Sequence, residues 1–96
     1  MDKIHKLELC KGRHEIPDAV DGSVFDFEIN PLKPDELEKQ AIERLQELNV
    51  RHLELYVTGL SVALVAVINA TKELKIDLVL YHYNKDDNTY FAQKVK

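Results

Sequence analysis

The spacing of apolar residues along the chain predicts two helices set among several strands. The clearest helix covers residues 34–48, where apolar positions recur every three or four residues. The apolar positions are Leu37, Ala41, Ile42, Leu45 and Leu48. Pro34 suits the first position of a helix, and Asn49 is a residue type that often adopts the left-handed conformation just after one.

Five shorter segments have the pattern of strands. Residues 3–10 and 24–29 alternate between apolar and polar side chains, whereas residues 53–57 and 76–83 are dense in apolar residues. Residues 84–88 are polar and predict a hairpin turn, after which residues 89–95 return as a last strand. The polar stretch 11–23, which holds Gly12, Pro17 and Gly22, predicts a long loop.

The apolar pattern of residues 60–74 is compatible with either a strand or a helix. Four β-branched residues favour a strand: Val62, Val65, Val67 and Ile68. The length of the run and its interspersed alanines favour a helix, which we therefore predict. Its apolar residues extend around much of the helical circumference, which predicts burial on more than one side. We expect a second subunit to cover the extra side, so the protein should be at least a homodimer.

The order of elements, β-β-α-β-α-β-β, predicts a single α/β domain spanning residues 1–96. Two consecutive right-handed crossovers would give a core of three parallel strands, completed by antiparallel additions. This is a small Rossmann-like domain with two or three layers.

Composition narrows the range of functions. The chain has a formal net charge of −4, which disfavours a general nucleic-acid-binding protein but allows one small anionic ligand. The only cysteine is Cys10, so no intrachain disulfide can form. We find neither a signal peptide nor a membrane-spanning run, and expect a cytoplasmic protein.

The first candidate binding segment is Thr58-Gly59-Leu60-Ser61, at the predicted junction of a strand and a helix. Gly59 would permit close approach of a ligand, and the free N–H groups of a helix start can bind phosphate. The hydroxyls of Thr58 and Ser61 would add donors. A glycine turn into a capped helix without any ligand explains the segment equally well.

Other candidate residues lie near the same predicted edge of the sheet. They are Arg13 and His14 in the long loop, His82 and Tyr83 at a strand end, Lys85 in the hairpin, and Gln93 on the last strand. The alternative interpretations are a solvated loop for Arg13 and His14, and for His82 a histidine at the end of a sheet that the tyrosines cover. Arg51 begins a strand and should lie at the opposite end of the sheet.

The sequence gives little indication of catalysis. No pair of histidines has metal-ligand spacing, and Cys10 has no evident base partner. We therefore expect no metal and no cofactor. General acid–base catalysis by His14 and His82 remains open.

Two halves of the sequence resemble small phage-encoded proteins of the anti-Thoeris sponge family. The motifs that carry the resemblance are Cys10-x-Gly12-Arg13-His14-Glu15-Ile16-Pro17, Asp21-Gly22-x-Val24-Phe25, Asn30-Pro31-Leu32, Tyr56-Val57-Thr58-Gly59-Leu60-Ser61 and Leu80-Tyr81-His82-Tyr83. The resemblance implies a protein that sequesters a cyclic ADP-ribose-type or cyclic nucleotide immune signal and thereby counteracts host anti-phage defence.

The strand–Thr-Gly–helix layout is also similar to CRISPR-associated Rossmann-type domains and small ring nucleases. These proteins bind or cleave cyclic oligoadenylate, but the present sequence lacks their histidine-rich helix segment. We therefore expect an oligomeric, non-enzymatic binding protein in the cytoplasm. The alternatives are a ring nuclease and an interaction subunit without a small ligand.

Overall fold

A computed structural model describes residues 3–11, 16–25, 29–58 and 60–95. The elements are β1 (Ile4–Cys10), β2 (Ser23–Phe25), α1 (Pro34–Glu47), β3 (His52–Tyr56), α2 (Ser61–Leu74), β4 (Asp77–Asn84) and β5 (Thr89–Val95). This order confirms the predicted α/β domain, including the helical reading of the ambiguous run. Neither helix is long and apolar enough to cross a membrane, as far as the described residues go.

The five strands form one sheet in the order β2-β1-β3-β4-β5. Strands β2, β1, β3 and β4 are parallel, and β5 is antiparallel to β4. The parallel core thus has four strands rather than the predicted three, and the antiparallel addition is β5 alone.

The difference arises from the connection that leads to β2. The backbone N–H of Asp21 donates to the carbonyl of Lys6 (3.0 Å), and the N–H of Glu8 donates to the carbonyl of Gly22 (2.9 Å). The chain therefore returns to the early part of β1 before β2 begins. Because of this return, β2 runs in the same direction as β1, and residues 16–22 of the connection contain no helix.

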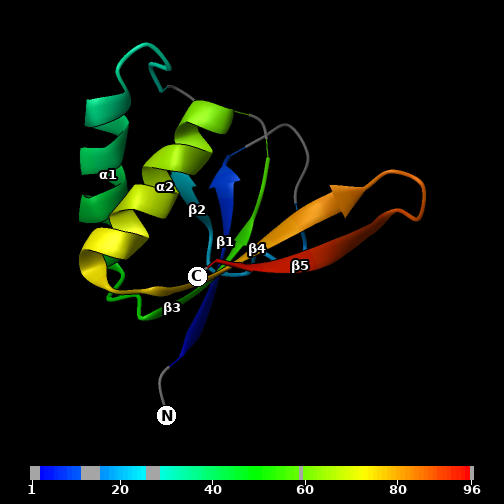
Figure 1. The fold of residues 1–96 in the computed structure, drawn as a ribbon. Helices are drawn as coiled ribbons and strands as arrows, with labels where there is room; N and C mark the ends of the chain where they lie inside the picture. The colour runs from blue at the N-terminus through cyan, green and yellow to red at the C-terminus, as the bar shows by residue number, and fades with distance from the viewer. Residues whose placement is uncertain (1–2, 12–15, 26–28, 59, 96) are drawn as a thin grey trace.

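Both helices lie on the same face of the sheet, so the domain has two layers (Figure 1). Helix α1 connects β2 to β3, and α2 connects β3 to β4. Both connections advance across the sheet in the same direction. Right-handed crossovers that advance the same way place their helices on the same side.

The core lies between this helical layer and the sheet. It is built from alternate strand residues and from one stripe on each helix: Leu7, Leu9, Leu53, Leu55, Leu78, Leu80, Leu37, Ala41, Leu45, Ala63, Ala66, Val67 and Ala70. Alanines dominate the buried side of α2 and allow close packing. On a second side α2 packs against α1 of the same chain, whereas Val65 is 54% exposed. Helix α1 therefore covers a second side of α2, and the homodimer stays a prediction.

The ends of both helices are defined by left-handed residues. Asn49 has a φ of 55°, which confirms the prediction that it terminates the first helix. Lys75 has a φ of 57° and ends α2, a role that its residue type does not indicate.

The carboxylate of Asp21 joins the segment before β2 to the start of β1. Its Oδ1 accepts a hydrogen bond from Nζ of Lys3 (2.7 Å), and its Oδ2 accepts one from the backbone N–H of Lys6 (2.9 Å). The bond from Lys3, followed by that from Lys6, lowers the pKa of Asp21 below its ordinary value of 3.8. The negative charge is therefore part of the native structure.

We expect Asp21→Asn to lower the free energy of unfolding by about 1.5 kcal/mol at pH 7, because two charge-assisted hydrogen bonds are weakened. A lowered native pKa contributes stability that is present above the unfolded-state pKa and is lost as the pH falls through the native pKa. The gap between wild type and variant should thus close in acid, in urea titrations at several pH values. Asp18→Asn, in the same exposed segment, is the control; an equal loss there would contradict the assignment.

Candidate functional site

The carboxyl ends of β1 and β3 are joined to each other by Thr58. Its Oγ1 accepts a hydrogen bond from the backbone N–H of Cys10 (3.3 Å) and donates one to the carbonyl of Cys10 (3.2 Å). The N–H of Val57 donates to the carbonyl of Tyr81 (2.9 Å), which holds the neighbouring strand end. The Thr58 side chain thus links two strand ends, and its hydroxyl hydrogen is used in the bond to Cys10.

Helix α2 begins beside these strand ends without a side-chain cap. Leu60 precedes the helix in an extended conformation (φ −76°, ψ 123°), and the first turn contains no acidic residue. The first N–H groups of a helix lack partners within the helix, and its start carries partial positive charge. Ser61, the first helical residue, is exposed. Gly59 lies outside the described residues, so the predicted glycine turn has no outcome here.

Two of the predicted residues are brought together on the hairpin. Nε2 of His82 lies 2.8 Å from Oε1 of Gln93, and the His82 ring lies 5.3 Å from that of Phe91. His82 follows the buried Leu80 by two residues, so it lies on the helix-bearing face of the sheet. Among the described residues, no hydrogen bond or ring contact joins this pair to the start of α2.

The structure separates two other predicted residues from His82. Tyr83 lies on the opposite face of the hairpin, where its hydroxyl donates to Oδ1 of Asn88 (2.7 Å) and its ring lies 5.4 Å from Tyr90. Lys85 is exposed in the hairpin turn. Arg13 and His14 fall outside the described residues.

A tyrosine cluster on the helix-free face was missed in the sequence. The ring of Tyr56 stacks on Tyr81 at 5.0 Å and meets the edge of Tyr90 at 5.1 Å. Burial is the main cause that raises the pKa of Tyr56, Tyr81 and Tyr90. The nearby carboxylate of Glu54 raises the pKa of Tyr56 and Tyr81 further. The cluster forms only when the strands are in register, so the sequence does not predict it. The one indication in the sequence is that Tyr81 and Tyr83 are two residues apart and so lie on the same face of a strand.

The described part of this end of the sheet contains one thiol, that of Cys10. Burial, assisted by the charge of Glu8, raises the pKa of the Cys10 thiol, which makes it a poor nucleophile at neutral pH. No group of three metal-ligating side chains occurs within the ranges that the structure describes. What this edge offers is backbone N–H groups, a histidine–amide pair and aromatic surface.

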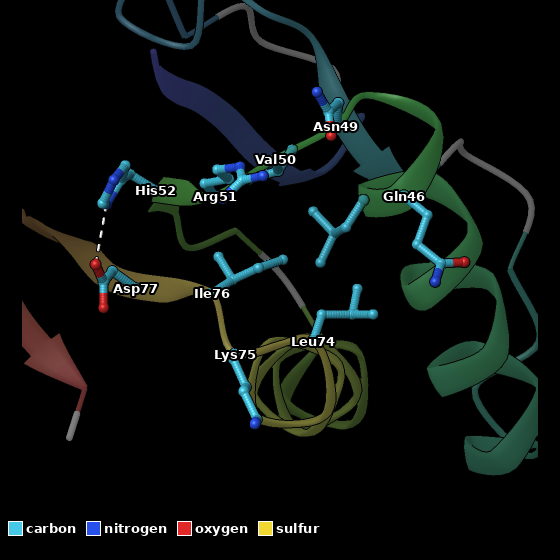
Figure 2. Close-up of a pocket in the computed structure, with 10 residues that line it drawn as sticks. Gln46, Asn49, Val50, Arg51, His52, Leu74, Lys75, Ile76 and Asp77 are labelled. Carbon is cyan, nitrogen blue, oxygen red and sulfur yellow. Dashed lines mark ion pairs between the residues drawn. The ribbon is translucent and has the colours of Figure 1, made fainter. Parts of the chain in front are cut away.

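A hollow of about 580 Å³ lies at the other end of the sheet. Figure 2 shows its residues, among them Arg51, Lys75, and the pair His52 and Asp77, whose Nδ1 and Oδ2 atoms are 3.0 Å apart. Arg51 is thus at the end predicted from the sequence. Both helices end at this hollow, where the partial negative charge of their C-termini is opposed by the positive charges of Arg51 and Lys75.

Comparison with known proteins adds no assignment to this geometry. A scan against protein-family models gave no match, and searches of the curated proteins and of the solved structures found no similar protein.

Proposed function

We propose that this protein binds a small nucleotide-type anion at the carboxyl end of its sheet and holds it without cleaving it. The observation that carries the proposal is the start of α2. This helix of 14 residues has no side-chain cap, and it begins at Ser61, shortly after the parallel strand β3 ends at Tyr56. In open parallel α/β sheets this position is the usual binding site for phosphate-bearing ligands.

Electrostatics supports a small ligand over a polymer. The whole chain has a net charge of −4, so its long-range field repels polyanions. The partial charge of a helix start acts over a short range and has no acidic side chain to oppose it in the first turn of α2. A ligand with one or a few phosphates matches this arrangement.

The ligand class follows from the resemblance to the phage sponge proteins. A cyclic ADP-ribose-type molecule or a cyclic nucleotide would place its phosphates at the helix start. The His82–Gln93 pair, with Phe91 beside it, would contact the base or ribose from the neighbouring hairpin. Retention of such a signal would counteract a host defence that depends on it.

The test is a retention experiment on the purified protein. The protein is incubated separately with cyclic ADP-ribose and with cyclic triadenylate, passed through a desalting column and denatured by heat; the released nucleotide is then identified by mass spectrometry. Release of the intact molecule is the expected result. Release of a linear product would replace the proposal with a ring nuclease, and failure to retain either molecule would overturn the ligand class.

A further inference from the structure

The outer edge of β5 is the most exposed strand edge of the molecule's sheet. Strand β5 is last in the strand order, and no described residue pairs with its outer side. At the other end of the sheet β2 has three residues in the described part of the chain, whereas β5 has seven. Figure 1 shows the hairpin of β4 and β5 extending away from the helical layer.

The side chains of β5 do not protect this edge. Soluble proteins usually shield an exposed strand with proline, charge, a bulge or a covering segment, because its free backbone groups can pair with another chain. Strand β5 contains no proline, and Lys94 is its only charged residue. Phe91 is 53% exposed, and Tyr83 on the paired strand is 47% exposed. The edge therefore combines unpaired backbone with apolar surface.

The sequence of β5 is complementary to itself when two copies run antiparallel about Ala92. In that register Ala92 faces Ala92 of the second copy, Phe91 faces Gln93, and Tyr90 faces Lys94. Lys94, the only charged residue of the strand, thus faces the aromatic ring of Tyr90, which attracts a cation. It does not face Lys94 of the second copy, whose like charge would repel it. A contact of this kind is isologous and closes after two subunits.

We propose that β5 pairs with β5 of a second copy of this chain, so that the two sheets join into one of ten strands. In each copy β5 is antiparallel to β4, and the two β5 strands are antiparallel to each other. The parallel strands of one copy therefore run opposite to those of the other. The starts of α2 in the two copies consequently lie at opposite ends of the joined sheet. Phe91 and Gln93, which would contact the base or ribose of the proposed ligand, lie in the seam itself.

A charge swap at the two-fold axis tests the proposal. Wild-type protein should be a dimer by light scattering and analytical ultracentrifugation at micromolar concentration. Ala92→Arg and Ala92→Glu should each weaken dimerisation by about a hundredfold, since each places like charges directly opposite each other. An equimolar mixture of the two variants should recover dimers, each containing one chain of each kind.

The controls separate this surface from others and from loss of fold. Circular dichroism checks that both Ala92 variants are folded. Recovery of the mixed dimer is an independent sign that both chains are folded. Val65→Arg, on the exposed side of α2, should leave the wild-type dimer unchanged. A monomeric wild type, a dimeric Ala92→Arg variant, or a mixture that stays monomeric would overturn the proposal. Retention of nucleotide by the wild-type protein is measured separately, so a failure to dimerise would leave the proposed function standing.

Discussion

Ser61→Glu is expected to weaken binding of the retained nucleotide by about a hundredfold while leaving the fold intact. Ser61 is the first residue of α2, and its side chain is exposed beside the uncapped N–H groups. A carboxylate there would occupy the positive end of the helix and repel a phosphate at the same point. Charge-assisted hydrogen bonds each contribute about 1.5–3 kcal/mol, so losing one or two gives this factor.

The same substitution should slightly stabilise the protein, by about 0.5 kcal/mol, because a negative side chain is favourable in the first turn of a helix. Binding is measured by isothermal titration calorimetry with whichever nucleotide the wild type retains, and stability by urea denaturation. Gln40→Glu introduces the same side chain on the exposed surface of α1; it is the control and should bind normally. Unchanged affinity in Ser61→Glu would exclude the start of α2 from the site.

Leu55→Ala is expected to lower the free energy of unfolding by about 3 kcal/mol. Leu55 lies on the central strand β3 and is fully buried, with Leu7 and Leu80 at the same level on the two neighbouring strands. Removing most of a buried leucine side chain loses its transfer free energy and leaves a cavity that rigid neighbours on both sides cannot fill. A domain of this size has only about 5–15 kcal/mol in total, so the loss is a large fraction.

Urea denaturation followed by circular dichroism measures this effect through the shift of the midpoint. Val65→Ala is the control, since its side chain is 54% exposed on α2 and should change the free energy by less than about 0.5 kcal/mol. Equal effects at the two positions would show that the sheet does not form the principal core.

The sequence by itself determined the elements and their order. Alternating leucines place one side of β1, β3 and β4 in the core, and this pattern depends only on the two-residue period of a strand. The length of the 60–74 run, rather than its β-branched residues, correctly indicated a helix, and Asn49 indicated where the first helix ends. These are local properties that the residues carry wherever they lie.

The tertiary structure decided what depends on contacts between distant residues. The hydrogen bonds of Asp21 and Gly22 to β1 make β2 parallel, and no periodicity encodes them. The common direction of both crossovers places α1 against α2, so that α1 covers a second side of α2. Strand register places His82 opposite Phe91 and diagonal to Gln93, and it turns Tyr83 to the opposite face. A single shift of register would exchange those two faces, because neighbouring side chains of a strand point in opposite directions.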